Sequence, residues 1–268
     1  MQSEASPSTK RSERLVALLA ALAERQQMQL SELATILGAS PATIRRDVAA
    51  LADQGLLTRT HGGVRAVGGG AELPVRLRDA RHRRAKHAIA LEAVAQLPSG
   101  RHAIALTGGT TTTEVLRALH HRHDLTIVTN SVSIALEAAN QGQARVLIAG
   151  GVLRPNSLEL VGSLTESTLR QINVGTAIIG SDGVSLAGGL TTHDETEAAT
   201  NHTMVERAQR VIAVVDGSKV GMVTLAKLAD LSEVDLLVTD SSADAAELAR
   251  IRSAGVPVLV VPVPAGDD

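Results

Sequence analysis

Two arginines lie near the amino end of a predicted helix, where the side chains of a DNA-reading helix meet base edges. Ser40 and Pro41 are typical of the cap and first position of a helix, and Thr43, Arg45 and Arg46 follow at once. An arginine binds a guanine edge or a phosphate through two parallel hydrogen bonds. The pattern therefore predicts a helix that binds in the major groove of DNA.

Three predicted helices and a hairpin position these side chains. Apolar residues recur at helical spacing in a first helix over 12–25, in a second that begins near the capping Ser31, and in a third over 40–54. Gly38 separates the last two, as expected of a residue that closes a helix. Two short β-type runs within 56–67 follow. This order predicts a winged helix-turn-helix.

The hairpin adds further donors for the DNA backbone. Arg59, His61 and Arg65 lie on or beside its predicted turn at Gly62 and Gly63. From there they would contact phosphates next to the groove that the third helix occupies.

The turn, the wing and the charge distribution together decide between two interpretations of the two helix arginines. In the alternative one, they solvate a surface helix or pair with Asp47 and Asp53. However, residues 1–90 contain 14 Lys and Arg against 8 Asp and Glu, whereas residues 91–268 contain 12 against 20. A basic amino-terminal part beside an acidic remainder favours DNA binding.

From residue 100 onward, short aliphatic runs alternate with helical stretches. The runs are HAIALT, LTIVTN, ARVLIAG, GTAIIG, RVIAVV, VDLLVTD and VPVLVV. This alternation predicts a Rossmann-like α/β domain with a mostly parallel sheet and helices on its faces.

The sequence GGTTT follows the first of these runs and begins a predicted helix. Gly109, Thr110, Thr111 and Thr112 bring backbone N–H groups and hydroxyls to the positive end of that helix, where a phosphate binds. The alternative is a capped helix start with spare threonines. The lysine and spacing of a P-loop are missing from this stretch, so a nucleoside triphosphatase is not favoured.

Further candidates follow the later runs, at the carboxyl ends of predicted strands. They are Asn130, Ser131, Gly150, Gly151, Asp182, Asp216 and Lys219. Alone, each is an ordinary turn residue. Their shared placement at the edge where α/β sheets bind ligands predicts one cleft.

The stretch SELATILGASPATIRRDVAALADQGLLTRTHGGV resembles the amino-terminal signature of the DeoR family of bacterial transcriptional regulators. The resemblance continues through GGTTT, TNS, SDG, GLTTHDETEA and DGSK, and covers roughly residues 11–240. The family often has an aspartate where this chain has Thr107, and aromatic residues near Val75, Ile178 and Val220. These departures bear on the identity of the effector.

The resemblance implies a sensor similar in fold to ribose-5-phosphate isomerases, and therefore a phosphorylated sugar as effector. On this view the three threonines of GGTTT hold the phosphate, and Asp182, Glu197, Asp216 and Lys219 face the sugar hydroxyls. The rival interpretation is a sugar-phosphate isomerase-like enzyme with an appended regulatory domain. Glu197 would be its base and Lys219 its electrostatic partner.

Composition excludes several other classes. The chain of 268 residues has no Cys, which rules out disulfides and thiolate metal sites, and it has no Phe, Tyr or Trp, so aliphatic residues must fill its core. We expect no cofactor and no metal. Its apolar stretches are shorter than the roughly 20 residues that span a bilayer, and its first residues lack a signal-peptide core, so we expect a cytoplasmic protein.

Together these features predict a two-domain regulator. We expect a disordered tail over 1–10, a winged helix-turn-helix over 11–67, a linker and connecting helix over 68–87, and an effector-sensing domain over 88–268. The predicted function is repression of genes of sugar or related carbon metabolism by a homo-oligomer, a dimer or a tetramer, that binds operator DNA and a small phosphorylated sugar.

Overall fold

The chain divides into two compact units in a computed structural model that describes residues 7–66, 72–79, 82–142 and 145–263. The division falls between residues 81 and 82. Each unit has its own buried apolar core, and the two are described separately.

The first unit is a helix-turn-helix with a small antiparallel sheet. Its helices are α1 (Pro7–Arg25), α2 (Leu30–Ile36), α3 (Pro41–Asp53) and α4 (Val75–Arg78). Its strands β1 (Gln27–Gln29), β2 (Leu57–Thr60) and β3 (Gly63–Ala66) pair in the order β1-β3-β2. Leu18, Leu33, Ile44 and Leu51 are fully buried and join the helices to one core. The predicted fold of this part is confirmed.

Several boundaries differ from the predicted ones. Helix α1 begins at Pro7, so residues 7–10 of the predicted tail are helical, while 1–6 lie outside the described residues. Helix α2 begins at Leu30 and not at Ser31, because the Glu32 carboxylate accepts a hydrogen bond from the Gln29 N–H at 3.0 Å. Strand β1 was not predicted, since three residues are too few for a recognisable pattern.

The turn of the wing lies one residue earlier than predicted. Thr60 pairs with Gly63, so the two turn residues are His61 and Gly62. Gly62 has a φ of 80°, which a glycine adopts without strain, and Gly63 belongs to β3. The wing therefore presents His61 at its tip.

The predicted linker is divided between the two units. Residues 67–71 and 80–81 lie outside the described residues. Helix α4 belongs to the first unit, where Leu77 packs into its core, and the second unit begins with α5 (Arg83–Ala95).

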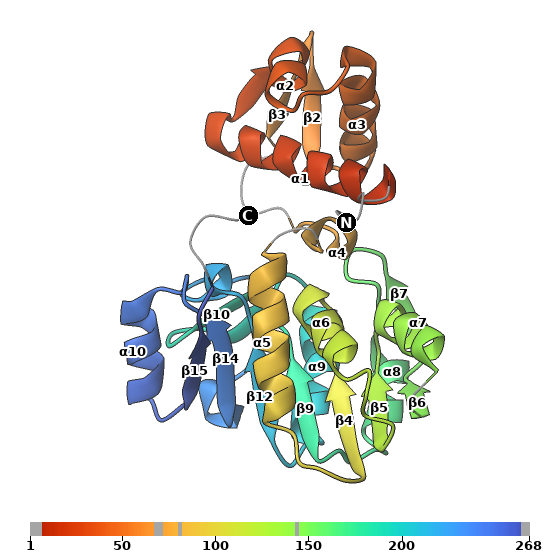
Figure 1. Ribbon diagram of the computed structural model, residues 1–268, viewed down its shortest axis with the longest axis vertical. Coiled ribbons are helices and arrows are strands. Elements are labelled where there is room, and N and C mark those ends of the chain that lie inside the picture. Colours follow the sequence, from red (N-terminus) through yellow and green to blue (C-terminus); the bar gives the residue numbers. More distant parts are fainter. Residues whose placement is uncertain (1–6, 67–71, 80–81, 143–144, 264–268) are drawn as a thin grey trace. The chain divides into compact units, whose positions relative to one another are not determined.

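The second unit is built on a seven-stranded parallel sheet (Figure 1). Its order is β15-β14-β12-β9-β4-β5-β6, with β4 (His102–Leu106), β5 (Leu125–Thr129), β6 (Arg145–Ile148), β9 (Thr176–Ile179), β12 (Val211–Val214), β14 (Leu236–Asp240) and β15 (Val258–Val261). Each of the seven predicted runs forms one of these strands. The mostly parallel α/β fold is confirmed.

Aliphatic residues cover both faces of this sheet. Along β4, Ile104 and Leu106 point into a core shared with α5, α6 (Thr110–Ala118) and α7 (Val132–Gln141). Ala105, between them, points into the core under α8 (Ser163–Leu169), α9 (Glu195–Glu206) and α10 (Ala245–Ser253). Alternating residues thus face opposite layers, as a sheet buried on both sides requires.

Short antiparallel strands lie outside the main sheet. Strands β7 (Val152–Arg154) and β8 (Glu159–Val161) form one pair. Strands β10 (Gly183–Ser185), β11 (Gly189–Thr192) and β13 (Ala226–Ala229) form a second sheet in that order. Within the described residues, no helix has the length and apolar character needed to span a membrane.

The order of the parallel strands creates a switch point beside β4. The chain passes from β4 to β5 and β6 on one side, and then crosses back to β9, β12, β14 and β15 on the other. Open α/β sheets bind ligands in the crevice at the carboxyl ends of the two strands where the order reverses, here β4 and β9.

Candidate functional site

The start of α3 is fixed by its predicted cap. Ser40 Oγ accepts a hydrogen bond from the Thr43 N–H at 3.2 Å and lies 2.9 Å from Thr43 Oγ1. Ile44 is buried one position later, which turns Arg45 and Arg46 to the exposed side. The helix therefore presents two arginines to solvent in its first two turns.

Asp47 binds arginines of another helix and not those of α3. Asp47 is 2% exposed, and its carboxylate accepts a hydrogen bond from Arg14 Nε at 2.6 Å. Arg11 Nε lies 3.6 Å from the other carboxylate oxygen. Asp47 therefore joins α3 to α1, and its charge is already neutralised without Arg45 or Arg46.

Replacing Asp47 with Ala is expected to destabilise the first unit by about 1 kcal/mol. A hydrogen bond to a charged group contributes about 1.5–3 kcal/mol, and the partial exposure of Arg14 reduces that figure. Urea unfolding followed by far-ultraviolet circular dichroism measures the change. Asp53→Ala, which removes an exposed carboxylate of the same helix, is the matched control. An equal loss in both variants would contradict a specific role for Asp47.

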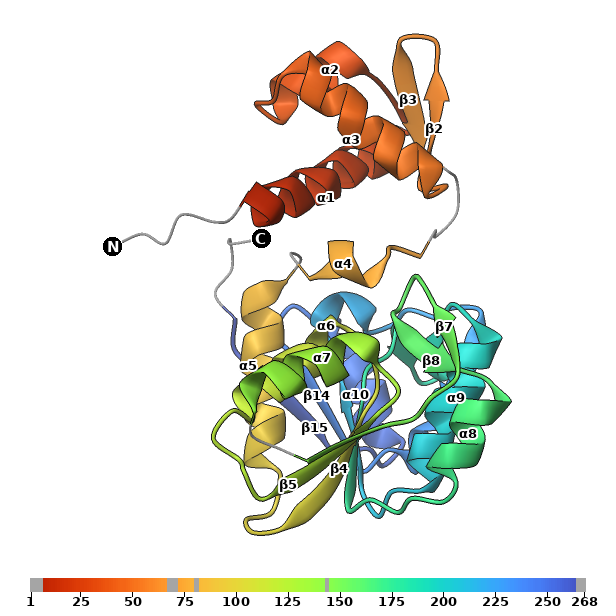
Figure 2. The same cartoon turned by 90° about the vertical axis from the view of Figure 1, so that its right-hand side faces the viewer.

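The wing exposes two of its three predicted polar side chains without a partner in the described residues. Arg59 on β2 and His61 at the turn are both exposed, and β2 packs against α3 (Figure 2). Arg65 instead donates to Gln27 Oε1 at 3.0 Å from its Nη2, which ties β3 to β1. The exposed polar groups of α3 and the wing belong to the same small unit.

The loop after β4 is held in place by its own threonines. Gly109 has a φ of 124°, and its carbonyl oxygen accepts the hydroxyls of Thr112 at 3.0 Å and Thr113 at 2.7 Å. Thr112 is fully buried, so its hydroxyl serves the loop and not the surface. Thr110 and Thr111 lie in the first turn of α6, beside backbone N–H groups that have no partner within the helix.

A chain of polar contacts joins the next predicted residues near the carboxyl end of β9. Asp182, after β9, lies with Oδ1 3.5 Å from Lys219 Nζ and with Oδ2 3.1 Å from Thr192 Oγ1. The same Thr192 oxygen lies 2.8 Å from Glu197 Oε1. Asp182, Thr192 and Glu197 are nearly buried, each at 8% exposure or less. Asp182, Glu197 and Lys219 therefore lie together, as the sequence predicted.

Glu197 is held by an arginine that the sequence analysis missed. Arg154, on β7, donates from Nη1 to Glu197 Oε2 at 3.0 Å, and its Nε lies 3.1 Å from Asp194 Oδ2. Burial raises the pKa of Glu197 above its ordinary value, and the nearby Asp182 charge acts in the same direction, while Arg154 opposes the shift. A buried carboxylate with such a partner is typical of a functional site.

A second buried carboxylate lies against the loop after β4. Glu159, on β8, is 1% exposed, and Asn201 donates to its Oε2 at 3.1 Å. A Cβ added to Gly108 would lie 2.3 Å from Glu159 Oε1, so a larger residue there would require the Glu159 side chain to move. Asn130 donates to Asn201 Oδ1 at 3.0 Å and to the Leu160 carbonyl. These contacts connect the loop after β4 with the end of β5 through Glu159 and Asn201.

Two buried oxygen atoms of this region have no hydrogen-bond partner among the described residues. They are Oδ1 of Asn130, at the end of β5, and Oγ of Ser181, at the end of β9. Both amide hydrogens of Asn130 already donate hydrogen bonds, so its oxygen is the one polar atom of this side chain without a partner among the described residues. A partnerless buried polar atom is costly unless a ligand or a water satisfies it.

The remaining predicted residues have local roles. Ser131 Oγ caps α7 through the Ile134 N–H at 3.3 Å, and Asp216 Oδ1 accepts from the Ser218 N–H at 3.1 Å. The Gly150 carbonyl accepts from Thr165 Oγ1 at 3.0 Å, and Gly151 lies against the same threonine. Such contacts match the alternative interpretation of these four positions as turns and caps.

Of the contact residues that were not predicted, Asn201 has a recognisable helical spacing from Asp194 and Glu197. Asp194, Glu197 and Asn201 are three and four residues apart, so they lie on one face of the amino-terminal part of α9, which faces β7 and β8 (Figure 2). The sequence therefore held a signal for Asn201. It held none for Arg154 and Glu159, whose strands are only three residues long.

These two units together define a class of protein: a DNA-binding transcriptional regulator with a ligand-sensing domain. The chain belongs to the DeoR family. Its residues 14–68 match the family model of the DeoR-like helix-turn-helix domain, and residues 81–241 match that of the DeoR C terminal sensor domain.

The curated relatives that match most of this chain are transcriptional regulators. The HTH-type transcriptional regulator GlpR of Haloferax volcanii is 38% identical over 224 residues, which cover 83% of this chain and 87% of that protein. The glycerol-3-phosphate regulon repressor of Escherichia coli K12 is 30% identical over 232 residues, 87% of this chain and 92% of that one. The chain is accordingly a regulator and not an enzyme.

Likeness to the isomerases is much weaker. Ribose 5-phosphate isomerase A from Methanocaldococcus jannaschii covers 50% of this chain and 53% of its own, with 19% identity and a TM-score of 0.38. A score of this size carries no argument about activity.

Proposed function

We propose that this regulator is a homo-oligomeric repressor of sugar or related carbon metabolism genes, controlled by a small phosphorylated sugar. Arg45 and Arg46 bind base edges and phosphates in an operator half-site, and Arg59 and His61 bind the adjacent backbone. A ligand at the carboxyl ends of β4 and β9 shifts the affinity for DNA, which requires that it bind the two functional states unequally.

The buried polar chain at the switch point carries the proposal about the ligand. Carboxylates of Asp182, Glu197 and Glu159 accept hydrogen bonds, and the orphaned Asn130 Oδ1 needs a donor. A polyhydroxylated ligand supplies such donors, whereas inorganic phosphate at neutral pH supplies few. The start of α6 and Lys219 favour an anionic group at the other end of the ligand.

The names of the relatives agree with this class of ligand. A glycerol-3-phosphate regulon repressor is named for a phosphorylated polyol, and it is similar to this chain over both units. We infer a phosphorylated three- to six-carbon polyol or sugar as the effector here.

Ligand binding is expected to raise the melting temperature of the protein. A ligand at 100 times its dissociation constant stabilises the folded state by about 2.7 kcal/mol. A panel of sugar phosphates, each paired with its unphosphorylated sugar and with inorganic phosphate, separates the two halves of the site. Because the chain has no Trp or Tyr, far-ultraviolet circular dichroism is the appropriate signal. Equal shifts by sugars and sugar phosphates would contradict an anion subsite.

A DNA-binding experiment with and without the ligand panel tests operator binding and its control by a sugar phosphate together. Random duplex DNA is enriched on the intact protein, and members of the panel are then added to the enriched complex. The expected result is a paired site whose affinity is changed by one phosphorylated compound. Binding that does not depend on salt, or no enrichment at all by folded protein, would contradict the proposal.

A further inference from the structure

Three buried polar side chains of the second unit form a directed chain of hydrogen bonds. Asn130, at the end of β5, donates from Nδ2 to Asn201 Oδ1 at 3.0 Å. Asn201, on α9, donates in turn from its Nδ2 to Glu159 Oε2 at 3.1 Å. Their exposed fractions are 0%, 3% and 1% in chain order from Asn130. We call these three residues the amide relay, because each donor in it points toward the Glu159 carboxylate.

Backbone hydrogen bonds fix the carboxylate end of the relay. The Leu160 N–H donates to the Asn130 carbonyl oxygen at 2.8 Å, and the Val132 N–H donates to the Leu158 carbonyl oxygen at 2.9 Å. Glu159 lies between these two contacts on β8 and directs its carboxylate to α9. Strand β8 and the segment after β5 therefore hold the two ends of the relay at a fixed separation.

The chemistry of the acceptors determines the orientation of both amides. An ionised carboxylate only accepts hydrogen bonds, so Asn201 turns its Nδ2 to Glu159 and its Oδ1 to Asn130. A backbone carbonyl also only accepts, and the Leu160 carbonyl oxygen lies 3.2 Å from Asn130 Nδ2. Both constraints require the amino group of Asn130 on this side. Its Oδ1, which has no partner among the described residues, is the acceptor that remains.

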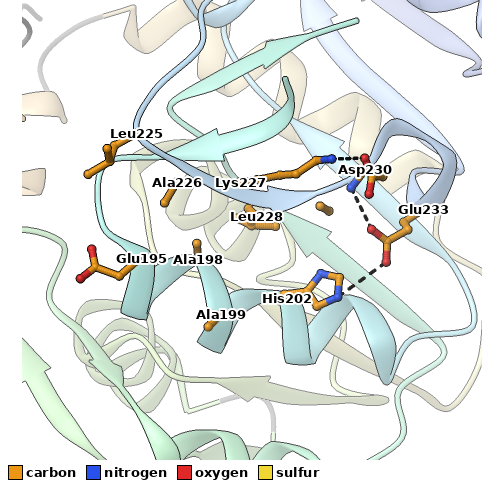
Figure 3. A pocket seen from close by; sticks show the side chains of 11 residues that line it. Glu195, Ala198, Ala199, His202, Leu225, Ala226, Lys227, Leu228, Asp230 and Glu233 are labelled. Carbon is orange, nitrogen blue, oxygen red and sulfur yellow. Dashed lines mark hydrogen bonds and ion pairs between the residues drawn. The ribbon is translucent and has the colours of Figure 1, made fainter. Parts of the chain in front are cut away.

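Helix α9 carries the relay on its buried side. Ala198, Ala199 and His202 of this helix line a groove of about 610 Å³ beside β13 (Figure 3). Asn201 is not among the residues that line this groove, and it is almost fully buried. The relay therefore belongs to the interior of the unit. In such surroundings the hydrogen bonds of the relay polarise one another, and its direction depends on its own members.

We propose that Asn201 and Glu159 are positioning residues that keep the oxygen of Asn130, and not its amino group, available to the effector. At this point the effector must then donate a hydrogen bond, as a hydroxyl does and as an ionised phosphate or a carbonyl oxygen does not. Strand β5 lies beside β4 in the sheet, so Asn130 adjoins the switch point. The selection of a donor rests on the proposed function for the presence of an effector, whereas the direction of the relay does not.

Reversal of the relay tests its direction without any ligand. Asn130→Asp replaces the amino group with an oxygen that faces Asn201 Oδ1, so we expect the urea midpoint to fall. Addition of Glu159→Gln supplies a donor at the far end, which lets Asn201 turn over and donate to the new carboxylate. We expect the folding equilibrium constant of the double variant to be about tenfold higher than the two single losses combined would give.

Glu159→Met is the matched control in combination with Asn130→Asp. It removes the same charge from a side chain of similar length, but it supplies no donor. A larger recovery with Gln than with Met therefore reports reversed hydrogen bonds and not the removal of a nearby charge. If Asn130→Asp alone does not fold, the same comparison is made on the yield of folded double variants. Equal recovery by Gln and Met, or recovery by neither, would overturn the proposal.

The selection of a donor is measured by ligand binding. The probes are glycerol 3-phosphate, ribose 5-phosphate and glucose 6-phosphate, each compared with its monodeoxy analogues by isothermal titration calorimetry. We expect one analogue to bind the intact protein about tenfold more weakly than its parent, because a buried acceptor left unpaired is costly. In Asn130→Ala that ratio should fall toward one, while the ratios for the other hydroxyls persist. Discrimination that survives Asn130→Ala unchanged would contradict the role of Asn130.

Failure of this inference and failure of the proposed function give different results. If no sugar phosphate binds while Gln, and not Met, recovers Asn130→Asp, the direction of the relay stands and the effector class falls, together with the selection. If a sugar phosphate binds but Gln and Met recover the variant equally, the function stands and the relay falls. The same holds if no deoxy analogue distinguishes the intact protein from Asn130→Ala.

Discussion

Combined Arg45→Ala and Arg46→Ala substitutions are expected to weaken operator binding by about 100-fold or more while the fold stays intact. Each arginine that contacts a base or a phosphate contributes about 1–3 kcal/mol, and two such losses reach that factor. Both side chains are exposed, and the buried Asp47 keeps its pairing with Arg14, so folding has little dependence on either arginine. Fluorescently labelled DNA in a titration gives the dissociation constants.

The salt dependence separates a specific from a purely electrostatic role. The slope of log affinity against log salt is expected to become shallower by about one for each phosphate contact that is lost. Arg250→Ala with Arg252→Ala is a charge-matched control, because both lie on α10 in the second unit and the net charge changes equally. Equal weakening by the two double variants would show that net charge, and not the α3 surface, drives binding.

Regular periodicity explains why the sequence predicts the large elements well. Each of the seven aliphatic runs becomes a strand of the parallel sheet, because strands buried on both faces must be continuously apolar. The third helix begins where Ser40 and Pro41 predicted, since their capping geometry depends only on local sequence. These features are decided within a few residues of chain.

The wing and the outer strands were harder to predict for the opposite reason. Strands β7, β8, β10, β11 and β13 have three or four residues each, and their pairing depends on residues far away in the chain. The turn of the wing moved by one residue, because Gly63 pairs with Thr60 instead of entering the turn. Patterns of two or three residues do not distinguish such alternatives.

The residues of the candidate site likewise differ in whether the sequence could predict them. Asp182 and Lys219 could be predicted because parallel strand ends converge on one edge of a sheet, whereas Glu197, inside α9, was expected only from the family resemblance. Arg154 and Glu159 could not, because a hairpin with no clear sequence signal places them against α9 and the loop after β4. Glu197 lies inside that contact network and not on the solvated face of its helix.

Glu197→Gln is expected to change how stability depends on pH. Burial raises the pKa of Glu197 in the folded protein, so the folded state binds more protons than the unfolded chain from near pH 4.5 up to the raised pKa. The stability that this group contributes is therefore complete below that window and falls as the pH rises through it, by up to about 1.4 kcal/mol for each pH unit. The Gln variant lacks this loss. The difference between its free energy of unfolding and that of the intact protein should therefore shift in favour of the variant as the pH rises.

Urea unfolding at a series of pH values measures this difference. Glu195→Gln is the matched control, because it removes an exposed carboxylate from the first turn of the same helix, and its curve should run parallel to that of the intact protein. Parallel curves for Glu197→Gln as well would mean that burial does not hold a proton on Glu197.

The affinity for the ligand should depend on pH over the same range. A sugar hydroxyl that donates to Glu197 stabilises the ionised form, so binding lowers its pKa and the affinity must rise with pH until the free protein is itself deprotonated. The Gln variant has no proton to release at this position, so its affinity for the same sugar phosphate should be weaker and should not rise through that window. In the proposed complex, a sugar hydroxyl would add a further hydrogen bond to a carboxylate that Thr192 and Arg154 already contact, and this added bond would favour the ionised form of Glu197.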